Sequence, residues 1–464
     1  MDTKDERIEY DALGEVRVPK NALYGAQSVR AVENFHITNQ KINPIMISSL
    51  GAVKKACAQA NEEAGELEPE IGNAIIKACE EIMAGVHNQE FITDPIQGGA
   101  GTSINMNANE IIANRASQLL GEPVGTYVRV HPNDHVNKAQ STNDIIPTSG
   151  KLTTILLGEK LLQEMERLVS VLNEKAEEFS SIIKVGRTHL QDAVLISMGQ
   201  VFKSYATLIK RDVKRLKYAL NEMKSINLGA TAVGTGINSV TGYKEKAIQN
   251  LSLITGIEFE GAEDLIDSTK HVDSFAYVHA ELKTFASGLS RMCNDLRMMA
   301  SGPKTGLNEI HLPAKQPGSS IMPGKVNPVI PEVVNQACFQ VIGNDATITM
   351  AAEAGQMELN VFEPVLFFNL FQSMEILKNA CYTLRVNALD GLTINERQCR
   401  QYVEESLAVG TSLVKELGYA KVSELTKQAL REERTLRELV LENHLISEKI
   451  LDEILEPQSM IRPR

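Results

Sequence analysis

The sequence predicts a mainly α-helical fold of three domains, built around a central bundle of five long helices. Apolar residues recur three or four positions apart over long stretches, as at Phe275, Val278, Leu282 and Phe285, which is the spacing of one buried helix face. Segments that contain glycine or proline separate these stretches. The predicted long helices cover residues 151–180, 202–223, 275–296, 329–350 and 361–388.

Changes in pattern along the chain predict the domain boundaries. Residues 1–140 form a mixed, mainly helical N-terminal domain, and the broken, polar stretch at residues 1–35 predicts a small hairpin or extended arm. Residues 141–396 form the long-helix bundle. Residues 397–464 are more charged and predict a small helical C-terminal domain. Two further helices of the first domain are expected at residues 44–64 and 70–85.

The length of the predicted helices indicates an assembly of several chains. A helix of about 28 residues spans about 42 Å. A chain with no tryptophan and 5% aromatic residues cannot bury both sides of such helices inside one compact monomer. We therefore expect an oligomer whose subunits pool their helices in a common core.

Charge and cysteine usage restrict the partners and the compartment. The 47 Lys and Arg residues against 59 Asp and Glu residues give a net charge of −12, which argues against nucleic acid or an anionic membrane as the partner. An anionic substrate stays compatible, because a site needs only a few local cations and donors. The six cysteines form no CxxC pair and predict reduced, buried thiols. Without a signal peptide or an apolar stretch of roughly 20 residues, the protein is expected to be cytoplasmic.

The segment 317–328 is the hardest to explain as a purely structural element. It carries Gly318, Ser319, Ser320, Gly324, Lys325 and Asn327, with strongly apolar helical stretches on both sides. Its glycines and prolines predict a loop. A plain surface connector is one interpretation, and a mobile flap that closes over an anion is the other.

Two other loops carry candidate polar groups. The glycine-rich loop Gly98–Thr102 can cradle a phosphate or a carboxylate with its backbone N–H groups. His189 is either a structural histidine or a group that binds a carboxylate or orients a leaving group. GxxxxGK[ST], GxGxxG, HExxH, a His/Cys ligand set and an EF-hand loop are all absent from the sequence. We expect neither a cofactor nor a metal at the catalytic centre.

Four motifs resemble those of one enzyme family. Gly318-Ser-Ser-Ile-Met-Pro-Gly-Lys-Val-Asn-Pro328 resembles the signature of the aspartase/fumarase superfamily, whose members eliminate a group from a dicarboxylate or related succinyl substrate to leave a fumarate unit. Matching stretches precede it in the expected order: Gly98-Gly-Ala-Gly-Thr-Ser103, Gln140-Ser-Thr-Asn-Asp144 and Gly186-Arg-Thr-His-Leu-Gln-Asp192. The resemblance runs from about Arg7 to about Met460. It implies a homotetramer in which three subunits contribute to each of four active sites.

The resemblance also implies a role for each site residue. Ser319 is the base that abstracts the β-carbon proton through an aci-carboxylate intermediate, in which the developing charge spreads into the neighbouring carboxylate. His189 is the second catalytic candidate, with Thr188 beside it. The substrate-binding residues implied are Gly101, Thr102, Ser103, Ser141, Thr142, Asn143, Thr188, Lys325 and Asn327. Among them, Thr102, Ser141, Thr142 and Asn143 surround one carboxylate, and Lys325 and Asn327 hold the other.

Smaller differences favour the aspartase branch, which releases ammonia from L-aspartate. Gly101-Thr-Ser-Ile-Asn105, the threonine at Thr142 and Glu358-Leu-Asn-Val-Phe-Glu-Pro364 resemble aspartases. Two segments point elsewhere: His131-Pro-Asn-Asp-His-Val-Asn137 is similar to the secondary dicarboxylate site of fumarases, and Thr411–Gly418 lacks the Asn-Pro of many aspartases. Fumarate hydratase is therefore the alternative function. A non-catalytic helical oligomer that retains the fold is the second alternative.

Overall fold

The computed structural model describes residues 5–456, 460 and 461, and α-helices dominate it. Residues 1–4 of the predicted first domain and residues 457–459 and 462–464 of the predicted last domain lie outside the described part. The helices are α1 Ala26–Asn34, α2 Pro44–Glu63, α3 Pro69–Met83, α4 Thr102–Leu119, α5 Thr142–Glu178, α6 Met198–Glu222, α7 Tyr243–Thr255, α8 Leu265–Lys270, α9 Asp273–Met299, α10 Val329–Glu353, α11 Glu363–Leu384, α12 Glu396–Glu405, α13 Gly410–Leu417, α14 Tyr419–Glu432, α15 Leu436–Glu442 and α16 Glu448–Ile454.

Within the described residues, the strands form four small two-stranded sheets. Three of the pairs are antiparallel, and β5 with β6 is parallel. The predicted N-terminal hairpin is confirmed by β1 and β2, in which Ile8 pairs with Arg17. The strands are β1 Glu6–Asp11, β2 Gly14–Pro19, β3 Ile183–Thr188, β4 Gln191–Ser197, β5 Ser225–Ile226, β6 Glu260–Gly261, β7 Ile310–His311 and β8 Thr393–Ile394.

The mainly helical fold and the five long helices are confirmed. These helices are α5, α6, α9, α10 and α11, with 37, 25, 27, 25 and 22 residues. The largest difference from the prediction is the start of α5, which begins at Thr142 and not near residue 151. The helices predicted at 44–64 and 70–85 are α2 and α3.

The chain divides into two compact units, and each long helix contributes residues to both. The first unit contains residues Met1–Leu162, Lys214–Thr284 and Phe339–Leu377, and the second contains Gln163–Val213, Phe285–Cys338 and Lys378–Arg464. The division into domains 1–140, 141–396 and 397–464 follows sequence order and stays a prediction.

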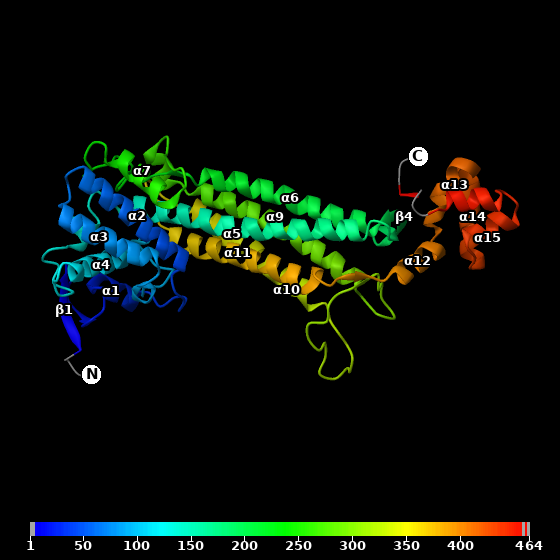
Figure 1. Ribbon diagram of the computed structural model, residues 1–464, viewed down its shortest axis with the longest axis horizontal. Coiled ribbons are helices and arrows are strands. Elements are labelled where there is room, and N and C mark those ends of the chain that lie inside the picture. Colours follow the sequence, from blue (N-terminus) through cyan, green and yellow to red (C-terminus); the bar gives the residue numbers. More distant parts are fainter. Residues whose placement is uncertain (1–4, 457–459, 462–464) are drawn as a thin grey trace. The chain divides into compact units, whose positions relative to one another are not determined.

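In the first unit, α2, α3 and α4 lie side by side, and α7 packs on α2 (Figure 1). The ring of Phe367 on α11 lies so close to Gly150 on α5 that a side chain at position 150 would overlap it. α9, α10 and α11 are joined by buried His279, whose Nδ1 lies 2.9 Å from the Asp345 carboxylate and whose Nε2 lies 2.9 Å from the Ser373 hydroxyl. Close packing and one polar cluster therefore hold this part of the bundle together.

In the second unit, the remaining parts of the long helices pack in the same way. The rings of Phe179 and Phe202 meet edge to face between α5 and α6, with centroids 5.4 Å apart. Asn335 on α10 donates to the Ser290 carbonyl on α9 at 2.9 Å. The short helices α13 to α16 enclose a separate apolar cluster that contains Leu413, Leu425 and Leu439 (Figure 1).

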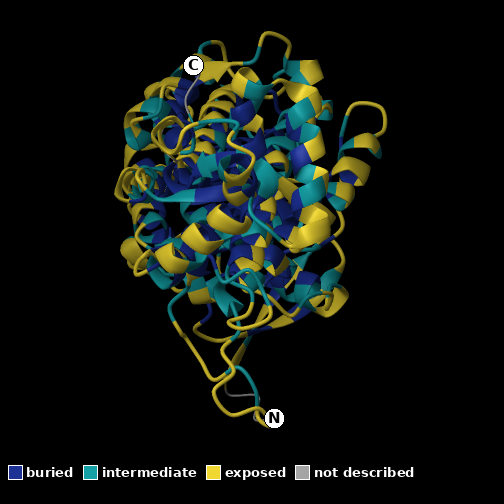
Figure 2. Cartoon of the chain, turned by 90° about the vertical axis from the view of Figure 1, so that its right-hand side faces the viewer, coloured by how far each residue is buried: buried dark blue, intermediate teal, exposed yellow. Residues whose placement is uncertain are grey.

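Helices of the chain show one buried side and one exposed side (Figure 2), as amphipathic helices do. On α10 the exposed side is unusually poor in charge. Phe339, Gly343, Ala346 and Met350 follow one another at spacings of four, three and four residues and are all exposed, Phe339 at 60% and Met350 at 62%. This α10 face presents apolar and small side chains where a surface helix normally presents polar ones.

All six cysteines are buried free thiols, as predicted. In the described part of the chain, no helix combines the length and the apolar character needed to cross a membrane.

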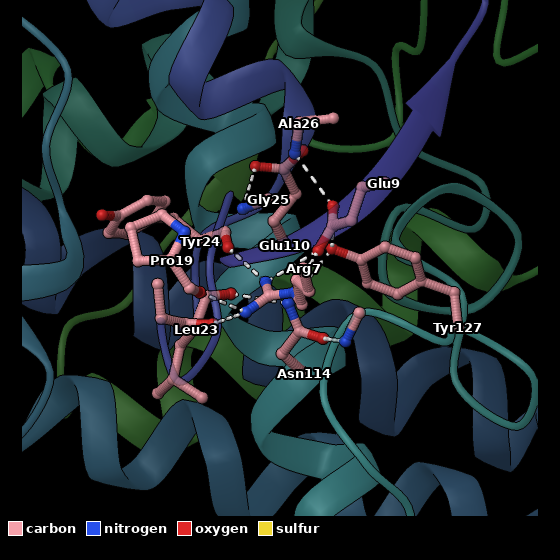
Figure 3. A network of polar contacts seen from close by, with 12 residues as sticks. Arg7, Glu9, Pro19, Leu23, Tyr24, Gly25, Ala26, Glu110, Asn114 and Tyr127 are labelled. Carbon is pink, nitrogen blue, oxygen red and sulfur yellow. Dashed lines mark hydrogen bonds and ion pairs between the residues drawn. The ribbon is translucent and has the colours of Figure 1, made fainter. Parts of the chain in front are cut away.

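A polar network fastens the N-terminal hairpin to α1 and α4 (Figure 3). Arg7 donates to the carbonyl groups of Pro19, Lys20, Ala22 and Tyr24 at 2.8–3.0 Å. Glu110 on α4 accepts hydrogen bonds at the start of α1 from the backbone N–H groups of Gly25, Gln27 and Ser28 and from the Ser28 hydroxyl. Burial raises the pKa of Glu110, and these donated hydrogen bonds oppose that shift.

Replacing Glu110 with Gln should lower the free energy of unfolding by about 1–3 kcal/mol, because an amide NH₂ would face donors that then lack an acceptor. Thermal unfolding followed by circular dichroism measures the change. Glu258→Gln is the matched control, since Glu258 is exposed in the same unit. Equal unfolding temperatures for Glu110→Gln and the wild type would contradict the proposed role of this carboxylate.

Candidate active site

The loop before α4 is shaped by residues with positive φ. Gly99, Ala100 and Gly101 have φ angles of +83°, +57° and +89°, a run that glycine tolerates far better than other residues. The Thr102 hydroxyl then donates to the Gly99 carbonyl at 2.7 Å. The loop therefore ends abruptly at Thr102, where α4 begins, and Thr102 is exposed while Ser103 is half-buried.

The start of α5 is fixed by a reciprocal pair of hydrogen bonds. The Ser141 hydroxyl accepts from the Asn143 N–H at 3.2 Å, and the Asp144 carboxylate accepts from the Ser141 N–H at 2.9 Å. This is the arrangement of a helix cap with an acidic residue three positions later. The prediction that α5 begins near residue 151 was wrong, because it followed the apolar stripe and overlooked this Ser-x-x-Asp signal. Thr142 and Asn143 therefore lie in the first turn of a helix.

The starts of α4 and α5 lie together in the first unit. A Cβ atom on Gly101 would come within 3.0 Å of Ile146 on α5, and the Asn105 amide donates to the Thr142 hydroxyl at 3.3 Å. Both helices thus direct their N-terminal N–H groups and their positive dipole ends to the same region. The predicted residues gathered there are Gly101, Thr102, Ser103, Ser141, Thr142 and Asn143.

A cavity of about 440 Å³ lies beside Ser141. Its walls include Asn137, Gln140 and Thr231, and Asn133 from the segment His131–Asn137. The Asn143 amide donates to the Ala232 carbonyl at 2.7 Å, so the loop before α7 is joined to the first turn of α5. The lining combines neutral polar groups that can donate or accept hydrogen bonds with one acidic and one basic residue, Asp134 and Lys138.

Asp144 supports this region from within, and the sequence interpretation gave it no role. Its side chain is buried and accepts from the N–H groups of Gly229 and Thr231 at 3.1 Å as well as from Ser141. Burial raises its pKa to about 6, while the hydrogen bonds from Ser141 and Thr231 work in the opposite direction. Asp144 therefore joins the α5 start to the loop at 229–231.

In the second unit, Thr188 and His189 belong to a strand hairpin and not to a simple loop. β3 ends at Thr188, β4 begins at Gln191, and the two residues pair. His189 and Leu190 form the turn with φ angles of +53° and +62°, as in the tight turns that match the twist of paired strands. His189 is exposed at the tip of this hairpin.

A buried carboxylate anchors the hairpin. Glu309 is fully buried and lies 2.8 Å from the Lys184 ammonium and 2.6 Å from the Arg187 guanidinium, both on β3. The Arg187 guanidinium also lies over the Tyr402 ring, 5.4 Å from its centroid. Glu309 immediately precedes β7, and the chain continues from β7 to the flap. The sequence interpretation missed Lys184 and Glu309, since no local motif connects residues so far apart.

The flap at 317–328 is an irregular loop, as predicted, and it lies between α9 and α10 (Figure 1). Its neck is closed by a hydrogen bond of 2.7 Å from the Gly318 N–H to the Lys325 carbonyl. The Asn327 amide donates to the Gly318 carbonyl at 2.8 Å. A side chain at position 318 would overlap the Lys325 backbone, so this close approach requires glycine.

Ser319 is held in a distinctive position inside the flap. Its hydroxyl oxygen accepts from the backbone N–H groups of Ile321 and Met322 at 3.2 and 3.0 Å. Lys325 is exposed, and its ammonium makes no ion pair with any described residue. The flap therefore combines a hydroxyl oxygen facing two N–H donors with a cation that is free to meet an anion.

The predicted site residues fall into two groups within one chain. Those at 101–103 and 141–143 belong to the first unit, and Thr188, His189, Ser319, Lys325 and Asn327 belong to the second. Within the second unit, the hairpin turn and residues 317–328 share no hydrogen bond or ion pair in the described structure. Glu309 is the link between the strand β3 and the segment that runs to the flap.

Comparison with known proteins identifies the family. The family model described as "Lyase" matches residues 14–343, and the one described as "Fumarase C C-terminus" matches residues 410–462. The aspartate ammonia-lyase of Bacillus subtilis (strain 168) is 49% identical over 460 residues, which cover 99% of this chain and 97% of that protein.

Solved structures are similar over nearly the whole chain. The structure described as fumarate lyase:delta crystallin from Brucella melitensis has a TM-score of 0.97 and 45% identity, covering 99% of this chain and all of that one. The class II fumarase of Schistosoma mansoni has a TM-score of 0.95 and 36% identity, with the same coverage. The relatives and solved structures cover 99% of the chain, and the two family models match most of it. The chain therefore belongs to the aspartase/fumarase superfamily of lyases.

Proposed function

We propose that this lyase catalyses the reversible elimination of ammonia from L-aspartate to give fumarate. The observation that carries the proposal is the Ser319 hydroxyl, held by two backbone N–H groups beside an exposed lysine in the family's signature loop. The 49% identity to an aspartate ammonia-lyase, against 36% to a class II fumarase, supports ammonia as the leaving group. The enzyme is thus a carbon–nitrogen lyase.

Proton removal next to a carboxylate requires that the developing charge be stabilised. The starts of α4 and α5 suit this task, because two helix N-termini and the hydroxyl and amide groups of Thr102, Ser141, Thr142 and Asn143 surround one region. Gly101 and Ser103 complete this binding surface. Neutral donors favour the doubly negative aci-carboxylate without strongly stabilising the singly negative substrate carboxylate.

Ser319 acts as the base at the β-carbon. A serine hydroxyl removes such a proton only if its alkoxide is stabilised. The N–H groups of Ile321 and Met322 already point at its oxygen and would donate more strongly to an alkoxide. Lys325 and Asn327 bind the second carboxylate, and Thr188 and His189 bind or orient the end of the substrate that carries the leaving group.

The enzyme works as a homotetramer with active sites shared between subunits. The exposed apolar α10 face, formed by Phe339, Gly343, Ala346 and Met350, supports contact with other copies of the chain. The division of the site residues between two units supports sites completed by several subunits. Six buried, reduced cysteines support a cytoplasmic location.

Ultraviolet absorbance distinguishes the proposed function from its alternatives. We expect fumarate to form from L-aspartate at a typical enzymatic turnover of about 1–1000 s⁻¹, and to form far more slowly from L-malate. Fumarate released from L-malate alone would establish a fumarate hydratase. Release from neither substrate by folded protein would favour the non-catalytic oligomer.

Ser319→Ala should lower kcat about 10²–10⁴-fold, the usual contribution of a general base, and leave KM nearly unchanged. Lys325→Ala should lower turnover and also raise KM, since it removes a cation that binds a substrate carboxylate. Ser320→Ala is the matched control, because Ser320 is the exposed neighbour in the same loop. Turnover by Ser319→Ala close to the wild-type rate would assign the base to another group.

Mixing two variants that are each expected to lose most of their activity tests the shared site. Ser319→Ala alters a residue of the second unit and Thr142→Ala one of the first. If different subunits supply them, random co-assembly after joint refolding should restore about a quarter of the sites, because each contributing position is intact in half of the subunits. Refolding each variant alone is the control. Activity that stays absent in mixed tetramers would mean that one subunit supplies both residues.

A further inference from the structure

Lys54 is a cation buried beneath the Ser141 loop. It lies in the middle of α2, its side chain is fully buried, and its ammonium donates to Asn137 Oδ1 at 3.0 Å and to Gln140 Oε1 at 2.8 Å. No carboxylate of the described structure lies within ion-pair distance of it. Burying an ammonium that has only neutral acceptors is costly, so the fold retains here a charge that packing alone does not explain.

The acceptors of Lys54 lead directly to the candidate active site. Asn137 Oδ1 also accepts from the Asn105 and Asn109 amides of α4 at 3.2 and 3.1 Å. The Asn137 amide donates to the Gln140 carbonyl at 3.3 Å. Gln140 precedes Ser141, and both Asn137 and Gln140 line the cavity beside Ser141. The Lys54 ammonium is therefore one amide group away from a cavity that reaches Ser141, one of the predicted carboxylate-binding residues.

We propose that Lys54 is a positioning residue that fixes the Asn137–Gln140 turn and supplies a buried positive charge to the carboxylate held by Thr102, Ser141, Thr142 and Asn143. The proposal rests on the proposed function of that site. An ammonium behind a wall of amides would attract the bound anion through a medium that screens charge less than water. It would act without touching the substrate and would attract the doubly negative intermediate more strongly than the substrate.

The groups around Lys54 determine how its charge depends on pH. Burial lowers the pKa of Lys54 to about 8, and Cys57, Asp144 and Cys79 oppose this shift. Burial raises the pKa of both thiols to about 12 and that of Tyr243, which contacts Cys57, well above its usual value. Among these neighbours, Lys54 alone changes charge between pH 7 and pH 9.5. It is protonated below about pH 8, so its attraction for an anion is present at neutral pH and lost as the pH rises.

Succinate binding tests the proposal, because succinate is a dicarboxylate without an amine that titrates in this range. Lys54→Met keeps the side-chain length and removes the charge. By calorimetry at pH 7, we expect its affinity for succinate to fall on the order of tenfold, as loss of one partly screened charge interaction predicts. Wild-type affinity should fall as the pH rises through about 8, and Lys54→Met should lose this inflection. Lys55→Met is the control, since Lys55 pairs at the surface with exposed Glu80.

A second variant tests the charge without removing the lysine. Gln140→Glu places a carboxylate at an acceptor of Lys54, so the paired ammonium should attract succinate less, and the inflection should move to higher pH. Its unfolding temperature should stay near that of the wild type, because the ion pair gained by the buried cation offsets the hydrogen bonds that the Gln140 amide donates to the Val136 and Lys138 carbonyls. If Lys54→Met does not fold, this variant and the wild-type pH profile still test whether the charge of Lys54 contributes to succinate binding.

The outcomes separate this proposal from the proposed function. Wild-type protein that neither binds succinate nor converts L-aspartate would overturn the proposed function. Wild-type protein that does both, while Lys54→Met shows the same affinity and the same pH profile, would overturn the role of Lys54 alone. Unchanged succinate affinity in Gln140→Glu would also overturn it. A purely structural role would lower stability in Lys54→Met without removing the inflection near pH 8.

Discussion

Buried carboxylates of this chain are held by donors from segments distant in sequence, and this requirement determines where several irregular segments lie. Glu110 binds the start of α1, more than 80 residues earlier. Asp144 binds the loop at 229–231, and Glu309 binds Lys184 and Arg187 on β3. A buried charge without partners would cost several kcal/mol. Each of these carboxylates therefore joins its own segment to a distant helix start, loop or strand that supplies the hydrogen-bond donors.

The need of buried carboxylates for hydrogen-bond donors also bears on how an acidic protein can bind an anionic substrate. The chain has a net charge of −12, yet the starts of α4 and α5 present backbone N–H groups, hydroxyls and amides, with Lys54 behind them. Asp144, a buried acid in the first turn of α5, accepts hydrogen bonds from the N–H groups of Ser141, Gly229 and Thr231. These N–H donors partly compensate the negative charge of Asp144. Local donors, and not the net charge, decide what the site attracts.

Features that repeat along the helix could be predicted from the sequence, and features set by distant pairing could not. The stripe from Phe275 to Leu296 predicted α9, and the glycines and prolines of 317–328 predicted an irregular loop. The start of α5 was missed because residues 142–150 have no apolar stripe and are buried mainly through small and polar side chains. The Arg187–Glu309 pair spans 122 positions, so no local pattern signals it. The family motifs indicated the site residues without their supports.

The supports also explain why the two groups of site residues differ in character. The group at 101–103 and 141–143 lies at helix starts that Asn105 and Asp144 hold by hydrogen bonds, so its donors are already oriented before any ligand arrives. The flap is held by its closed neck, by the hydrogen bonds to the Ser319 oxygen and by a bond of 3.3 Å from the Lys325 N–H to the Met322 carbonyl, and Ile321 at its tip is 83% exposed. A base must approach its proton closely but also release the product. The rigid donors at the helix starts suit the binding of the carboxylate. The lightly held flap suits a base that must first approach the proton and then allow the product to leave.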